Sequence, residues 1–85
     1  MKVKEVKVGE IFTIDSSWVR PKLKLKQGFL DMATQYIWVC WEEHEAEVLT
    51  DIQIIKIARN WRLTLEQFER HKQKMVKKYI EEVNK

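Results

Sequence analysis

The segment Gln35–Trp41, near the middle of the chain, constrains the fold more than any other. It holds no charged residue and is dominated by aromatic and β-branched side chains, which favour the pleated backbone. Side chains alternate between the two faces of a strand, so Trp38 would lie on one face and Trp41 on the other. Both faces would be apolar, although one face of an antiparallel sheet is commonly solvated. The segment therefore predicts a strand whose second face is covered by another element, with Cys40 buried as a small apolar side chain.

The size of the chain limits what can provide that cover. Its 85 residues suffice for one domain with one compact core, and 45% apolar residues with four tryptophans exclude a disordered composition. The longest apolar run, Ile37–Trp41, is far shorter than the roughly 20 residues of a membrane-spanning helix. We expect a soluble, cytoplasmic protein with a single domain over residues 1–85.

Further short strands are predicted around two glycines and one proline, which mark the turns. Pro21 makes the preceding residue extended and indicates an edge strand or the first position of a strand. After it, Lys22, Lys24 and Lys26 alternate with leucines and would share one strand face. The predicted strands cover residues 2–8, 10–14, 18–26, 29–32 and 35–41.

Residues 48–57 are compatible with two structures. Their many β-branched side chains favour strands on either side of a polar turn at Thr50-Asp51. The alternative is a helix across Glu45–Arg59, which would place a sheet of three or four strands under two helices.

The C-terminal segment predicts a long amphipathic helix. Thr64 and Gln67 have the spacing of a capping box, and apolar residues then recur at helical intervals as far as Val83. We therefore predict an α+β fold: a small antiparallel sheet of four to six short strands, a partial SH3-like barrel, over residues 1–61, and one long helix over 62–85. The helix would cover the sheet or extend to a partner.

Charge is unevenly distributed along the chain. The net charge is +4 over residues 1–30, −4 over 31–60 and +3 over 61–85, which predicts surface fields of opposite sign. The candidate basic patch is Arg20, Lys22, Lys24, Lys26, Arg70, Lys74, Lys77 and Lys78. The candidate acidic patch is Glu42, Glu43, Glu45 and Glu47. Trp18 and Trp61, close to basic residues, are candidate aromatic anchors.

No residue pattern in the sequence indicates catalysis. One cysteine and two histidines do not supply a zinc ligand set, and no glycine-rich phosphate loop is present. We expect a protein that is not an enzyme and has no metal or other cofactor.

Two functions follow from these surfaces. The first is a small protein-interaction module, an inhibitor or regulator, that docks on a protein partner or on a second copy through its acidic and basic patches. The alternative is a nucleic-acid-binding small β-barrel that uses its lysine-rich strand face and tryptophan. No membrane partner is expected. The hairpin layout after Val8-Gly9-Glu10-Ile11-Phe12 resembles that of many small phage or mobile-element β-proteins, a resemblance of layout that implies no site residues.

Overall fold

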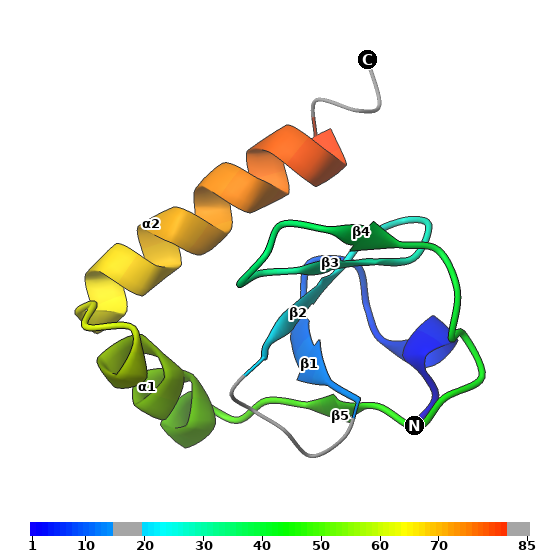
Figure 1. Ribbon diagram of the computed structural model, residues 1–85, viewed down its shortest axis with the longest axis horizontal. Helices are drawn as coiled ribbons and strands as arrows, with labels where there is room; N and C mark the ends of the chain where they lie inside the picture. Colours follow the sequence, from blue (N-terminus) through cyan, green and yellow to red (C-terminus); the bar gives the residue numbers. More distant parts are fainter. Residues whose placement is uncertain (15–19, 82–85) are drawn as a thin grey trace. The chain divides into compact units, whose positions relative to one another are not determined.

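The computed structural model describes residues 1–14 and 20–81. The chain divides into two compact units, Met1–Leu49 and Thr50–Lys85. The described strands belong to the first unit and the long helices to the second (Figure 1). The helical part thus begins earlier than the boundary predicted between residues 61 and 62.

Within the described part of the first unit, five short strands form one antiparallel sheet (Figure 1). They are β1 (Ile11–Thr13), β2 (Lys22–Lys24), β3 (Phe29–Asp31), β4 (Ile37–Trp38) and β5 (Glu47–Val48). Their order across the sheet is β4-β3-β2-β1-β5, so β4 and β5 form its two edges and the sheet is open. The predicted small antiparallel sheet followed by a C-terminal helix is confirmed, whereas the SH3-like barrel stays a prediction.

One hydrophobic cluster in the core of this unit is built around two phenylalanines. Phe12 from β1 and Phe29 from β3 are buried, and their rings meet edge to face with centroids 5.6 Å apart. Val3, Val6 and Ala46 complete the cluster. Other apolar residues of the same unit are buried as well: Ile11, Leu23, Leu25, Leu30, Met32 and Leu49. Burial of each large apolar side chain contributes roughly 1.5–3 kcal/mol, so both sets stabilise the sheet.

The N-terminal segment is not the strand predicted over residues 2–8. Val3–Glu5 form a short 3₁₀ helix, η1, in which the backbone N–H of Lys2 donates to the Glu5 carboxylate at 2.8 Å. Val3 and Val6 are both buried. Their spacing of three matches the three residues per turn of a 3₁₀ helix, so this period, rather than strand alternation, sets the conformation.

Residues 51–60 form a helix, α1 (Asp51–Asn60), and the strand predicted there is wrong. Thr50 accepts a hydrogen bond from the Gln53 backbone, and the Gln53 side chain accepts one from the Thr50 backbone at 2.8 Å. This capping box begins the helix in spite of the β-branched side chains that follow it. The alternative prediction, a helix across Glu45–Arg59, agrees better with α1, although its first turn is occupied by β5.

The C-terminal helix is confirmed. It comprises α2 (Leu65–Val76) and a π-helical continuation, η2 (Lys77–Glu81). The predicted capping box is present, with hydrogen bonds of 2.8 and 3.1 Å between Thr64 and Gln67. Phe68 and Met75 are its buried residues, and the Phe68 ring lies 5.6 Å from that of Trp61 in the turn after α1. The predicted packing of this helix on the sheet stays a prediction.

Gln35–Trp41 differs most from its prediction. Only Ile37 and Trp38 form a strand, and among the described strands β4 pairs with β3 alone. Gln35 and Trp41 have positive φ angles of 62° and 70°, which bend the chain at each end of the segment and leave a two-residue strand between them. The predicted strand with both faces covered is therefore wrong: this segment is an exposed edge, and Cys40 is exposed rather than buried.

Candidate functional site

Two tryptophans that strand alternation would separate lie together on the surface of the first unit. The ring centroids of Trp38 and Trp41 are 6.0 Å apart at an interplanar angle of 31°, and each residue is 44% exposed. Trp41 also stacks on His44 at 5.2 Å and lies 6.5 Å from Phe29. The left-handed backbone at Trp41 breaks the alternation and turns its ring toward Trp38. A local sequence pattern does not predict such a bend at a residue other than glycine.

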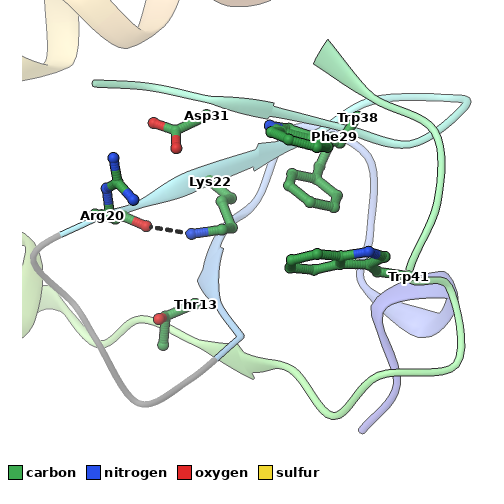
Figure 2. Close-up of a pocket in the computed structure, with 7 residues that line it drawn as sticks. All are labelled: Thr13, Arg20, Lys22, Phe29, Asp31, Trp38 and Trp41. Atoms are coloured by element: carbon green, nitrogen blue, oxygen red, sulfur yellow. Dashed lines mark hydrogen bonds between the residues drawn. The ribbon is translucent and has the colours of Figure 1, made fainter. Parts of the chain in front are cut away.

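These rings form one wall of a cavity of about 170 Å³, shown in Figure 2. The cavity is lined by three aromatic residues, Phe29, Trp38 and Trp41, and by four polar ones, Thr13, Arg20, Lys22 and Asp31. In Figure 2 the two indoles lie at one end and the charged groups at the other. A cavity of this kind accepts an apolar side chain beside the rings and leaves the charged end for polar contacts.

The charged end is held by local hydrogen bonds. The Lys22 ammonium donates to the Arg20 carbonyl oxygen at 2.8 Å (Figure 2), and Asp31 accepts hydrogen bonds from the backbone of Ala33 and Thr34 at 2.9 and 3.3 Å. Asp31 is itself buried, so its carboxylate fixes the turn after β3 as well as lining the cavity.

The sheet edge next to this cavity is apolar and exposed. No charged residue occurs between Gln35 and Trp41, and Ile37 and Val39 are 50% and 70% exposed. The opposite edge differs, because Glu47 belongs to β5 and the N-terminal segment pairs with the residues just before it, through a bridge from Lys2 to Glu45. Charged side chains and covering segments are the usual protection of a sheet edge, and β4 has neither among the described residues of the first unit.

The backbone of β4 also has groups that face outward. The Asp31 N–H donates to the Tyr36 carbonyl oxygen at 2.8 Å, and the next residues are paired as Leu30 with Ile37 and Phe29 with Trp38. Hydrogen-bonded and non-hydrogen-bonded pairs alternate along an antiparallel ladder. The N–H and C=O of Ile37 therefore point away from β3, toward the open edge.

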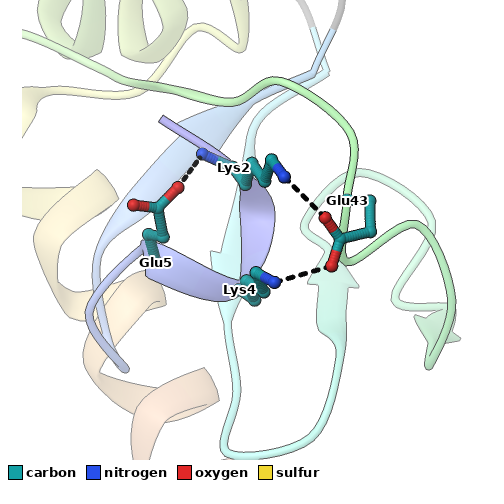
Figure 3. Close-up of polar contacts among 4 residues, drawn as sticks. All are labelled: Lys2, Lys4, Glu5 and Glu43. Carbon is teal, nitrogen blue, oxygen red and sulfur yellow. Dashed lines mark hydrogen bonds and ion pairs between the residues drawn. The ribbon is translucent and has the colours of Figure 1, made fainter.

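The candidate acidic patch is largely used within the chain. Glu43 binds the ammonium groups of Lys2 and Lys4, each at 2.7 Å (Figure 3), and Glu45 lies 3.4 Å from the N-terminal amine. Hydrogen bonds from Lys2 and Lys4 lower the pKa of the Glu43 carboxyl to about 2, and the same bonds raise the pKa values of both lysines. All four glutamates of the patch are exposed on the surface. Two of them, Glu43 and Glu45, have cationic partners within the chain.

The candidate basic patch separates into two groups. On β2, Lys24 is only 7% exposed, and its ammonium donates to the Leu25 carbonyl oxygen at 3.1 Å, while Lys22 is half-buried. Arg20 and Lys26 are exposed. The expected face of three solvent-exposed lysines is therefore not present on this strand.

The second basic group lies on the C-terminal helix. Arg70, Lys74, Lys77 and Lys78 are all exposed and are spaced so that they share one helix face. We call these four residues the basic helix face. Arg70 is also bound to Glu66, four residues earlier on the helix, at 2.6 Å.

Of the two candidate aromatic anchors, one has a clear place. Trp61 is half-buried and its ring lies near those of Phe68 and His71, at 5.6 and 6.3 Å, so it belongs to the packing of the helical unit. Trp18 lies outside the described residues. The aromatic site on the first unit is built instead from Trp38 and Trp41.

Neither a metal site nor a membrane span is found in residues 1–14 and 20–81. No three His, Cys, Asp or Glu side chains gather there as a metal ion would require, and none of the helices is both long and apolar enough to cross a bilayer. Comparison with known proteins adds no relative: no family model, no curated protein and no solved structure matches this chain.

Proposed function

We propose that this chain is a non-enzymatic protein-interaction module that binds an extended segment of a partner protein along the open edge of β4. The observation that carries the proposal is the exposed and uncharged edge at Ile37–Trp41. An apolar edge of this kind pairs readily with other strands, and stable proteins normally protect it. Addition of a peptide strand to a sheet edge is a recurrent mode of recognition. As an inhibitor or regulator, the module would act by occupying that segment.

Backbone and side chains would contribute separately to this binding. The outward N–H and C=O of Ile37 supply a hydrogen-bonded pair for an incoming strand, which fixes its register. Side chains of that strand alternate, so every second one faces the same side of the sheet as Trp38. An apolar side chain at that position would contact Trp38 and Trp41 beside the cavity, where aromatic residues contribute most to binding energy.

This proposal revises the patches predicted from the sequence. Pairing of Glu43 and Glu45 with the N-terminal segment weakens the acidic patch as a docking field. The buried Lys24 removes support from a nucleic-acid site on the β2 face. The apolar edge therefore replaces the charged patches as the proposed contact surface of the first unit.

The first test uses amide hydrogen exchange in the free protein. We expect the Ile37 amide to exchange much faster than that of Trp38, because Trp38 is hydrogen-bonded to β3 and Ile37 faces the open edge. Peptides are then selected from a displayed library of random dodecapeptides. Binding of a selected peptide should slow exchange at Ile37 at least tenfold and leave Trp38 nearly unchanged.

The second test places a charge on the edge. Val39→Lys should weaken binding of the selected peptides tenfold or more, since Val39 directly follows β4 and a lysine at a sheet edge opposes strand addition. Ile52→Lys is the matched control, because Ile52 on α1 is 67% exposed and Val39 is 70% exposed. Equal binding by parent and Val39→Lys, or unchanged exchange at Ile37 in the complex, would contradict the proposal.

Self-association has to be separated from partner binding. Sedimentation equilibrium on the protein alone should show a monomer at the concentrations used for selection. A dimer in which protection at Ile37 rises with protein concentration would identify a second copy as the occupant and would overturn the proposed partner segment.

A further inference from the structure

Net positive charge is concentrated in the helical unit. Residues 50–85 carry nine Lys or Arg and five Asp or Glu, a net charge of +4, whereas residues 1–49 carry seven and eight, a net charge of −1. The excess of +3 over the whole chain thus comes from Thr50–Lys85. The electrostatic field of a protein depends on where its charges lie on the surface, so the positions of these charges on the helix decide what they can bind.

The basic helix face concentrates four of them. Lys74 follows Arg70 by four residues, and Lys77 and Lys78 follow Lys74 by three and four, over about 12 Å of helix at 1.5 Å per residue. Phe68 and Met75 mark the buried side of the same helix, away from these cations. All four basic residues are exposed.

Among the described residues, Glu66 and Glu81 stand three or four positions from these cations, so the face keeps a net charge of +2. Glu66 binds Arg70 at 2.6 Å, but both side chains are 73% exposed, and such a surface ion pair contributes little and exchanges partners readily. The Lys78 ammonium lies 5.2 Å from the centre of the Tyr79 ring, a contact that leaves its charge intact.

We infer that the basic helix face binds double-stranded DNA, with its four cations on phosphates and the helix along the major groove. The charge complementarity is direct, since the duplex carries one negative charge per roughly 1.7 Å of its axis. An α-helix with its side chains is about 10–12 Å wide, which matches the width of the major groove, about 12 Å. This function is separate from peptide binding at β4 and does not depend on it.

An anionic bilayer is a less suitable partner for the same face. A helix that lies on a membrane inserts an apolar face between the lipids. Here Phe68 and Met75 are buried, and Tyr79 and Ile80 are half-buried. The basic helix face is therefore suited to a polyanion that is bound through its charges alone.

The test measures binding of a fluorescent DNA duplex by anisotropy at several salt concentrations. Four phosphate contacts predict a slope of log K against log salt of about −3.6, so that affinity falls about 150-fold between 50 and 200 mM salt. Lys74→Gln with Lys78→Gln should reduce the slope to about −1.8 and the loss to about 12-fold. Both lysines are exposed, and a circular dichroism spectrum checks that the helix is intact.

The matched control is Lys7→Gln with Lys26→Gln, which removes two exposed lysines of the first unit and changes the net charge equally. It should keep the slope of the parent. An equal effect of the two double variants would show that net charge alone governs binding and would overturn the inference. A salt-dependence slope near zero for the parent protein would also overturn the inference, and this measurement needs no variant.

Three competing ligands complete the experiment. The inference is overturned if a single strand of the same length binds as tightly as the duplex, because a groove is then not required. Equal binding of poly-glutamate would indicate an acidic protein as the partner. Sedimentation with phosphatidylserine vesicles, lost in the Lys74 and Lys78 variant, would indicate a membrane surface.

Discussion

Gly28 controls whether β4 can pair with the sheet. Its φ is +74°, and a Cβ built on it would collide with the carbonyl oxygen of Trp38 and would lie 2.8 Å from the Cα of Val39. Real Cβ contacts essentially never fall below 3.0 Å, and every atom met is backbone. Gly28→Ala therefore requires the β4 backbone to move by about 1 Å or more, which breaks the pairs Phe29–Trp38 and Leu30–Ile37.

The cost of Gly28→Ala has two parts. Holding alanine at positive φ costs about 1 kcal/mol, and losing the two-residue ladder costs about 1 kcal/mol for each of two hydrogen bonds. The expected loss is therefore about 3 kcal/mol in the free energy of unfolding, measured by urea titration. Gly9→Ala is the control, because Gly9 has a φ of +92° with no atom within 4 Å of an added Cβ, so that only the conformational cost of about 1 kcal/mol applies.

The difference in the free energy of unfolding between the two alanine variants measures the energetic effect of the close approach of Gly28 to the β4 backbone. Thermal unfolding should place the Gly28→Ala midpoint about 10 °C or more below that of Gly9→Ala. Peptide binding at the β4 edge should be lost in Gly28→Ala and kept in Gly9→Ala. Equal stability of the two variants would refute the reasoning, because the contact with Trp38 would then have no energetic consequence.

Three further predictions concern the core, the helix and the N-terminal ion pairs. Phe12→Ala should cost about 4 kcal/mol in urea unfolding, with much of it recovered in Phe12→Leu, since Phe12 has no exposed surface; a cost below about 1 kcal/mol would contradict the assigned core. Thr64→Ala should remove about 1 kcal/mol of helix stability, and Thr64→Ser should restore it, as followed by circular dichroism; an unchanged melting curve would contradict the cap. Glu43 should titrate by NMR near pH 2, because its pKa is lowered from 4.5, so its stabilising contribution is complete above about pH 4.5 and is lost as the pH falls toward 2. Glu43→Gln should accordingly lower the melting temperature much less at pH 2 than at pH 7, and a titration midpoint above pH 4 would contradict the paired geometry.

Local patterns in the sequence predicted the local parts of the fold. The strands around Phe12 and Phe29 and the helix after Thr64 follow from alternation, turn residues and a capping box, each of which acts within a few residues. The same capping signal stands at Thr50 and Gln53, where it begins α1. Strand propensity obscured it, because β-branched side chains are only weakly unfavourable in a helix whose first turn is well capped.

The edge at β4 was not predictable in the same way. The composition of Gln35–Trp41 predicted a strand correctly, but the positions that limit it are Gln35 and Trp41, both in the left-handed region without being glycine. Tertiary contacts hold such conformations, and a sequence pattern does not contain them. The meeting of Trp38 with Trp41, which forms the aromatic site, follows from that bend.

Charge patterns were informative only once the partners were known. Glu43 lies about forty residues from Lys2 and Lys4 in the sequence, so the composition of the acidic run did not reveal its ion pairs. The net charge was also counted over residues 31–60 as one block, and this block contains parts of both units. Once the boundary is placed at Thr50, the excess positive charge belongs to the helical unit.

The exposed position of Cys40 has a practical consequence for every experiment on this protein. It is the sole cysteine of the sequence and follows β4 by two residues, outside the core. A thiol-reactive fluorophore or spin label would attach there without any engineered site and would report directly on whatever approaches Trp38. For the same reason, preparations kept without a reducing agent should accumulate covalent pairs of chains, joined beside the very strand whose free state is to be measured.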